Sequence, residues 1–319
     1  MSMYTEFVYK FPTFSFPSSG FSLFRFSEGI YLGISSSQEV VLAIESSEPQ
    51  RDSRTIFTDT LRLVLNAKSS LTEDSITTLK TMNLLLFKHG DQKALRVFFE
   101  ICGIFIKGDD IGSTDRMVEI FETIRSMFSK AHDLTFSELQ GLYTELYLIR
   151  VFQNDINLAE YWHSESNLKF DFSISSNLKL EVKSTLGDLR KHHFQHDQLS
   201  NNLNDIYVSS FMLQRDDQGL SLEDLVHSLH DLLQVNEKQY IRIQKILLNT
   251  DSVLLSTVRF NEQYTVDRLR FYKGVNIPRF AESTPTGVTS AEYDSILETA
   301  PTESLEDILQ TIQTEESVN

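Results

Sequence analysis

The chain has 319 residues, of which 45 are acidic and 29 are basic, so its formal net charge is −16, and 40% of its residues are hydrophobic. This apolar content is enough for one large domain or two smaller ones and excludes a mostly disordered chain. No apolar run reaches the ~18 residues that a membrane-spanning helix needs, so we expect no contact with a membrane.

The start of the chain, residues 1–17, is rich in Phe but lacks the features of a secretion signal. It has no basic start, no continuous apolar block and no small-residue cleavage site, which predicts a cytoplasmic protein. From Phe21 to about Leu65, short β-rich runs alternate with Gly and Ser turns. Residues 1–70 are therefore expected to form an antiparallel β-rich module.

Between residues 76 and 130 the apolar spacing lengthens toward 3.6 residues, with Leu79, Met82 and Leu86 on one stripe. This spacing predicts a helical segment over residues 71–133. The single cysteine, Cys102, lies in an apolar run and is expected to be inert core.

A helix is predicted after residue 134, and its start is marked by Thr135 and Glu138, which have the spacing of a capping box. Glu145 lies in the same helix, in the middle of its apolar stripe beside Leu142 and Leu148. A carboxylate aimed at the core must be neutralised, paired or metal-bound, because an isolated buried charge is expensive.

Two runs that alternate apolar and polar residues follow, at 170–175 and 178–183. The short link between them predicts a hairpin with a three-residue loop, and only an odd loop keeps apolar residues facing each other, with 172 opposite 180. That register sets Asp171 opposite Glu181, where like charges are destabilising unless a cation lies between them. Lys183 emerges on the same face. We expect a divalent cation to bridge the two acids, although charged residues also alternate on ordinary half-exposed strands.

A basic cluster follows the hairpin: Arg190, Lys191, His192, His193 and His196. A surface cluster or a phosphate-contacting strip is favoured over a zinc site, because no Cys is near and the His spacing is irregular. Farther on, the patterns predict a strand at 206–213, helices at 222–233 and 237–248, and a β-like segment at 264–272.

The C-terminal residues 282–319 contain nine acids and no Lys or Arg, which leaves a charge of only −7 on residues 1–281. A protein that holds DNA by itself normally has a basic surface, so a role on nucleic acid requires a local basic strip or a partner protein. Leu305, Ile308 and Ile312 have helical spacing in this tail. The tail is expected to dock on its own body or on another chain, with equal weight for each.

These motifs together resemble the PD-(D/E)XK nuclease superfamily, whose core runs helix, three strands, helix, strand. The resemblance extends to a family of bacterial proteins found in restriction and phage-defence gene clusters beside methyltransferases and ATPases. The matching residues are Gly141 to Leu146, Trp162, Asp171-Phe172, Glu181-Val182-Lys183, Arg190-Lys191-His192 and Gln198-Leu199. Phe170 stands where the name-giving Pro would be.

The resemblance implies an α/β (α+β) fold with a restriction-endonuclease-like αβββαβ core at residues 134–281, between the helical segment and the acidic tail. It implies that Glu145, Asp171 and Glu181 are metal-site acids, joined by the backbone carbonyl of Val182. Lys183 would be the catalytic lysine. Gln198 would support the active site.

The predicted function is a Mg²⁺-dependent endodeoxyribonuclease of a restriction-modification or phage-defence system, with Mn²⁺ as a substitute ion. Arg190 and His192 are the candidates for contact with DNA. An ATPase and a methyltransferase are the expected protein partners, and homo-oligomerisation is left open. The alternatives are a non-cleaving scaffold subunit of such a complex, because superfamily membership does not guarantee cleavage, and a nuclease that acts on RNA.

Overall fold

The computed structural model describes residues 2–13, 15–73, 76–88, 91–108, 110–128, 134–163, 170–199, 204–280, 287–288 and 290–316. The chain divides into two compact units, Met1–Ala131 and His132–Asn319. The β-rich module and the helical segment thus belong to the first unit, and the expected nuclease core and the acidic tail belong to the second. No helix among the described residues is long and apolar enough to cross a membrane.

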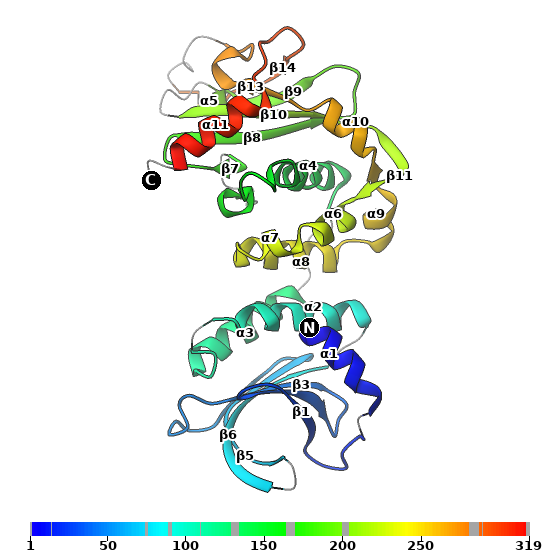
Figure 1. The fold of residues 1–319 in the computed structure, drawn as a ribbon, viewed down its shortest axis with the longest axis vertical. Helices are drawn as coiled ribbons and strands as arrows, with labels where there is room; N and C mark the ends of the chain where they lie inside the picture. Colours follow the sequence, from blue (N-terminus) through cyan, green and yellow to red (C-terminus); the bar gives the residue numbers. More distant parts are fainter. Residues whose placement is uncertain are drawn as a thin grey trace. The chain divides into compact units, whose positions relative to one another are not determined.

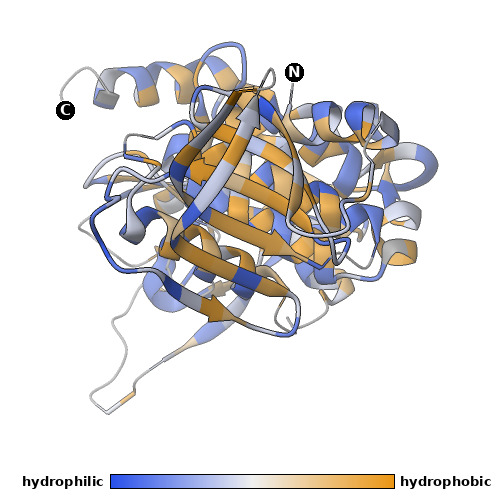
Figure 2. Ribbon diagram, turned by 90° about the horizontal axis from the view of Figure 1, so that it is seen from below, coloured by the Kyte–Doolittle hydropathy of each residue, from blue (hydrophilic) through white to orange (hydrophobic). Residues whose placement is uncertain are grey.

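The first unit contains a six-stranded antiparallel sheet in the order β1-β2-β3-β6-β5-β4, which curves strongly (Figure 1). Its strands are β1 (Phe21–Ser27), β2 (Ile30–Ser35), β3 (Val40–Glu45), β4 (Arg54–Phe57), β5 (Leu61–Glu73) and β6 (Ile76–Phe87). Seen from below, hydrophobic residues run along its strands (Figure 2). The first unit also contains helices α1 (Met3–Lys10), α2 (Gln92–Phe105) and α3 (Thr114–Met127), and η1 (Phe11–Thr13) follows α1. Helix α3 packs against β5 and β6, and α2 contacts both α1 and α3.

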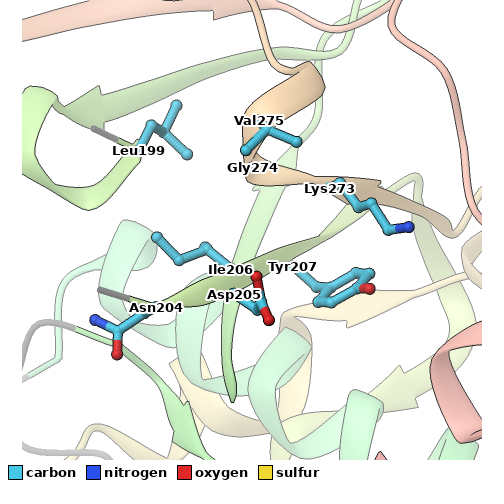
Figure 3. Close-up of a pocket in the computed structure, with 8 residues that line it drawn as sticks. All are labelled: Leu199, Asn204, Asp205, Ile206, Tyr207, Lys273, Gly274 and Val275. Atoms are coloured by element: carbon cyan, nitrogen blue, oxygen red, sulfur yellow. The ribbon is translucent and has the colours of Figure 1, made fainter. Parts of the chain in front are cut away.

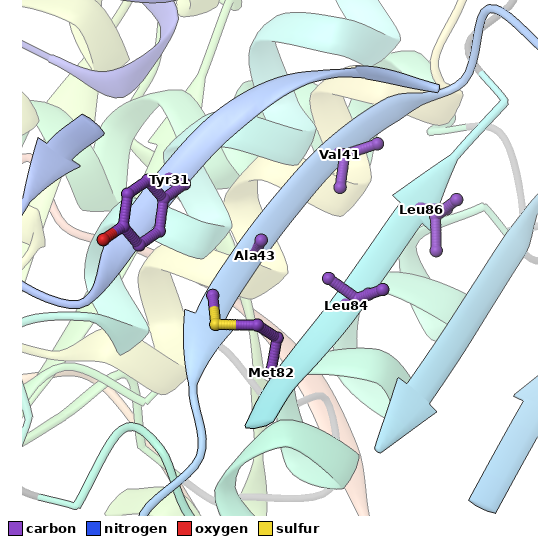
Figure 4. Packing of buried hydrophobic residues seen from close by; sticks show 6 residues of the cluster. All are labelled: Tyr31, Val41, Ala43, Met82, Leu84 and Leu86. Atoms are coloured by element: carbon purple, nitrogen blue, oxygen red, sulfur yellow. The ribbon is translucent and has the colours of Figure 1, made fainter. Parts of the chain in front are cut away.

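Residues 76–87 form a strand, so the prediction of a helix there is wrong. Met82, Leu84 and Leu86 alternate along β6 and pack against Val41 and its neighbours in one buried cluster (Figure 4). Residues 83, 85 and 87, on the opposite face of the strand, are buried as well. The sequence therefore lacks the alternation of apolar and polar residues that marks a half-exposed strand. Leu79, which completed the apparent helical stripe, is 74% exposed. The antiparallel strands predicted between 21 and 65 and the helices after residue 91 are confirmed.

The second unit is built on a four-stranded sheet in the order β13-β10-β8-β7. The strands are β7 (Phe172–Ser173), β8 (Leu178–Thr185), β10 (Asp205–Met212) and β13 (Arg270–Lys273), and the long helix α4 (Phe136–Phe152) packs on β8 (Figure 1). The central strands β8 and β10 are parallel, and the two edge strands are antiparallel to them. This mixed α/β arrangement has the helix, hairpin and parallel strand that the PD-(D/E)XK core requires.

Shorter elements surround this sheet. They are η2 (Leu158–Tyr161), β9 (Lys191–Gln195), α5 (His196–Leu199), β11 (Arg215–Ser221), α6 (Leu222–Ser228), α7 (His230–Leu233), α8 (Glu237–Asn249), α9 (Ser252–Thr257), β12 (Arg259–Phe260), α10 (Glu262–Asp267) and η3 (Gly274–Asn276). The helix predicted at 222–233 is interrupted at Leu229. The strand predicted at 264–272 is wrong in its first half, because the Asn261 side chain accepts a hydrogen bond from the Tyr264 amide and caps α10.

The acidic C-terminal segment folds onto its own unit. Strand β14 (Glu292–Ile296) pairs antiparallel with β9, and helix α11 (Leu305–Glu316) follows it. Ile308 and Ile312 of α11 are almost completely buried, and Leu297 joins a core cluster with Phe194 and Val208. Of the two alternatives for the tail, the structure therefore shows docking on the chain's own body.

Candidate active site

Helix α4 brings Glu145 to the site. The predicted capping box is present, because the Thr135 hydroxyl accepts from the Glu138 amide and the Glu138 carboxylate accepts from the Thr135 amide. Glu145 Oε2 accepts a hydrogen bond of 2.8 Å from the indole Nε1 of Trp162, which is fully buried. Thr144 and Tyr147 are buried too, so α4 is enclosed on nearly every side rather than along one stripe.

The hairpin has the predicted register, with Phe172 opposite Leu180 and Ser173 opposite Lys179. Strand β7 is shorter than expected because Asp171 lies in a bend just before it. There its carboxylate Oδ2 accepts a hydrogen bond of 2.7 Å from the Val182 amide on β8. The acid thus reaches across the strand pair to the backbone immediately after Glu181.

Glu181 is held by two neighbours, both at the same oxygen. Lys183 Nζ lies 2.7 Å from Glu181 Oε1, and Gln198 Nε2 donates to that oxygen at 3.0 Å. Glu181 is only 5% exposed, and its second oxygen, Oε2, is buried without a hydrogen-bond partner among the described residues. A buried unpaired oxygen is costly, so this atom is suited to accept a ligand that the protein itself does not supply.

The three acids affect one another electrostatically. Burial raises the pKa of Glu145 to about 7, and the charge on Glu181 adds to this increase although the Trp162 bond opposes it. Burial and then the charges on Glu181 and Glu145 raise the pKa of Asp171 well above its usual range. Burial also raises the pKa of Glu181, against the effect of Lys183. The charge on Glu181 thus raises the pKa of both other acids, and a dication beside these carboxylates would relieve that repulsion.

The donors fit a hard divalent cation in chemistry, although the structure does not form a complete cage. Within the described part of the chain, no three His, Cys, Asp or Glu side chains are arranged to hold a metal ion. The Asp171 and Glu181 carboxylates, with the unpaired Oε2 of Glu181, are oxygen donors of the type that Mg²⁺ prefers. The Val182 amide is engaged by Asp171, and a ligand role for the Val182 carbonyl stays a prediction.

Gln198, which the resemblance implies to be a supporting residue of the site, lies against Glu181. It belongs to the single-turn helix α5, which directly follows β9, and it is 9% exposed. Its Oε1 accepts from the Gln195 amide while its Nε2 donates to Glu181. The amide therefore ties the end of β9 to the acid and fixes which carboxylate oxygen is left unpaired.

Arg190 and His192 do not lie on the surface, which corrects their prediction as DNA contacts. Arg190 is 4% exposed, and its guanidinium donates to the Ser210 carbonyl and hydroxyl and to the Arg268 carbonyl. His192 is 3% exposed and bonds the same Ser210 hydroxyl at 2.7 Å. Burial, with the charges of Lys183 and Arg190, lowers the pKa of His192 to about 4, so the ring is neutral near pH 7. Alternation along β9 turns these residues inward and their neighbours outward.

Two residues near the acids have roles that the sequence patterns did not predict. Trp162 is one of the residues that match the family, but no pattern assigned it a role, and its indole donates a hydrogen bond to Glu145. Arg242 on α8 is half-buried, and its positive charge lowers the pKa of Glu145. In the sequence, Arg242 is only one of several charged residues on an amphipathic helix, next to Ile243. No sequence pattern indicates that its charge acts on Glu145 of α4.

A cavity of about 290 Å³ lies elsewhere in this unit, near the start of β10 (Figure 3). Asp205, Ile206 and Lys273 are among its lining residues, and none of the three acids of the site lines it. In the parallel ladder Asp205 is level with Leu178, whereas Glu181 is level with Val208. The cavity is therefore separate from the site.

The single tryptophan should report the ionisation of Glu145. Because burial disfavours the charged form, Glu145 is protonated below about pH 7 and ionised above it in the metal-free protein. Trp162 fluorescence is expected to change with a midpoint near pH 7, since its Nε1 bonds this carboxyl. Glu145→Gln should abolish the transition. A transition that persists in that variant would contradict the assignment.

Comparison with known proteins agrees with this geometry. The chain matches the DUF4420 family, described as a PD-(D/E)XK family member, over residues 26–298. Comparison with curated proteins and with solved structures gives no match. The family match covers most of the chain, including α4, the hairpin and the Glu181-Val182-Lys183 motif. The chain therefore belongs to this PD-(D/E)XK family.

Proposed function

We propose that the chain is a Mg²⁺-dependent endonuclease that hydrolyses phosphodiester bonds in DNA within a restriction or anti-phage defence system. The observation that carries the proposal is the buried Oε2 of Glu181, which has no hydrogen-bond partner in the described part of the chain, on a side chain held by Lys183 while Asp171 bonds the adjacent Val182 amide. A dication bound beside this acid would satisfy the oxygen that the ion pair with Lys183 and the Gln198 hydrogen bond leave without a partner among the described residues.

The chain's own residues divide the work. Asp171 and Glu181 would hold the ion, Glu145 would add negative charge to the site, and Gln198 keeps Glu181 in place through its hydrogen bond. The ion, when bound, polarises the phosphoryl oxygen and lowers the pKa of the attacking water. The Lys183 ammonium orients that water and stabilises the charge that develops on the phosphate. The half-burial of Lys183 and its distance of 2.7 Å from Glu181 support this role.

Matched DNA and RNA duplexes of one sequence test the substrate. The purified protein is expected to nick the DNA in Mg²⁺ or Mn²⁺ and to be inactive in EDTA. Cleavage of the RNA duplex alone would refute the DNA proposal and favour the RNA alternative. Cleavage that persists in EDTA would refute the role of the metal.

A second candidate is a non-cleaving subunit that uses this fold to join an ATPase and a methyltransferase in a defence complex. It is favoured by one observation, that no three-ligand metal cluster is formed among the described residues. Both candidates act on DNA together with protein partners. Those partners would supply the affinity for the phosphate backbone that an acidic chain lacks. They differ in whether the charge of Glu181 is needed for restriction.

A further inference from the structure

The outward face of strand β9 carries one lysine and one histidine. Lys191 and His193 alternate with the buried His192 and Phe194, and their side chains are 55% and 59% exposed. We call these two residues the β9 strip. In an acidic chain, two exposed basic side chains on one strand face are a local feature that attracts phosphate.

The β9 strip is opposed by two acids of the neighbouring strand, Glu292 and Asp294, which we call the β14 acids. Lys191 Nζ lies 2.7 Å from Asp294 Oδ2. The His193 ring nitrogens lie 3.2 Å from Asp294 and 3.3 Å from Glu292. Hydrogen bonds from Lys191 and His193 lower the pKa of Asp294, so this acid stays ionised.

The fold does not depend on these exposed ion pairs. Strand β14 is held by its backbone ladder with β9, which runs from Glu292 opposite Gln195 to Ile296 opposite Lys191. The Leu297 amide donates to the Arg190 carbonyl, and the Leu297 side chain is fully buried. Solvent-exposed ion pairs add little stability. The charges of the β14 acids therefore contribute little to stability, and their main effect is to repel anionic ligands that approach β9 from solvent.

The β9 strip is close to the site. His193 lies between His192 and Phe194 in the chain, and Lys183 Nζ lies 5.4 Å from the centre of the Phe194 ring. The same strand leads into α5, whose Gln198 bonds Glu181. His193 faces the opposite side of β9 from Phe194, so a duplex engaged at Lys183 would reach the β9 strip around the edge of this single strand.

We propose that the β9 strip contacts the phosphate backbone of the nucleic acid, and that the β14 acids weaken this contact from within the same chain. The inference rests on the proposed function for the identity of the ligand as DNA. It extends that function with a binding surface and with a built-in electrostatic limit on affinity.

The test measures binding rather than cleavage. A fluorescein-labelled DNA duplex is titrated with the full-length protein in EDTA, and anisotropy gives Kd from about 50 to 200 mM KCl. Glu292→Gln with Asp294→Asn is expected to lower Kd about tenfold at the lowest salt and to steepen the salt dependence by about two phosphate contacts. The matched control, Glu160→Gln with Asp231→Asn, makes the same charge change at exposed acids outside β14 and is expected to change Kd less than twofold.

The gain must depend on the β9 strip. Adding Lys191→Gln and His193→Gln to the β14 double variant is expected to return Kd and salt dependence to the wild-type values. An equal gain in the control variant, or a gain that survives loss of the strip, would overturn the proposal. Because no cleavage is measured, a protein that binds as expected but never cuts DNA would refute only the catalytic function. A protein that cuts DNA with Kd unaffected by the β14 changes would refute only this surface.

Discussion

Glu181→Gln is expected to lower DNA cleavage by about a thousandfold or more while the protein stays folded. The amide keeps the shape of the side chain but removes the charge that would hold the ion, and such electrostatic contributions are worth several kcal/mol in a dry site. Burial already raises the pKa of Glu181, so a neutral side chain costs the fold little. Initial rates of plasmid nicking in Mg²⁺ and a thermal melt of each variant give the two measurements.

Two companions to Glu181→Gln separate the candidate functions. Lys183→Ala should lower cleavage by a similar factor, because it removes the cation beside the reacting phosphate. Glu160→Gln, an exposed acid of the same unit, should cleave like the wild type. If Glu181→Gln and Lys183→Ala both restrict phage normally in the reconstituted system, the catalytic proposal is wrong and the scaffold is favoured.

Arg190→Leu is expected to destabilise the second unit by about 2–4 kcal/mol, the second large effect. The substitution leaves the carbonyl of the buried Ser210, and that of Arg268, without the donor they have now, and an unpaired buried group carries its full desolvation cost. The midpoint of thermal unfolding should fall by about 5–15 °C. Urea or thermal denaturation followed by circular dichroism measures the change.

The neighbouring Lys191 provides the matched control. Its ammonium is exposed and makes one surface ion pair with Asp294, so Lys191→Leu should cost under about 1 kcal/mol. If Arg190→Leu instead leaves the melting midpoint unchanged and weakens DNA binding, Arg190 contacts phosphate after all, and its burial here does not describe the functional state.

The parts of the fold that the sequence predicted correctly depend on local patterns. The hairpin register follows from alternation and from an odd loop, and Phe172 opposite Leu180 confirms it. The capping box at Thr135 is likewise a contact over three residues. The spacing in strand β6 resembles that of a helix because both faces of its second half, residues 82–87, are buried, and this burial depends on elements distant in sequence such as β3.

The site was predictable only in part, for the same reason. Asp171, Glu181 and Lys183 lie on one hairpin, and the family likeness added Glu145 and Gln198. The direction in which Arg190 points is set by its hydrogen bonds to Ser210 and Arg268, 20 and 78 residues later in the chain, so no local sequence pattern predicts it. The charge of Arg242 on α8 acts on Glu145 of α4, and the spacing of apolar residues along a helix does not predict which helices pack together.

The pairing of β9 with β14 also has a consequence for the order of biosynthesis. Translation delivers β9, α5 and the Glu181 strand long before residues 292–296 exist, and domains acquire structure as the chain emerges. Until then one edge of β9 has no partner, and Leu297 cannot yet fill the cluster around Phe194. The segment that carries Gln198 therefore gains its full support only late in translation, so a nascent chain that ends before β14 would lack a properly assembled candidate site.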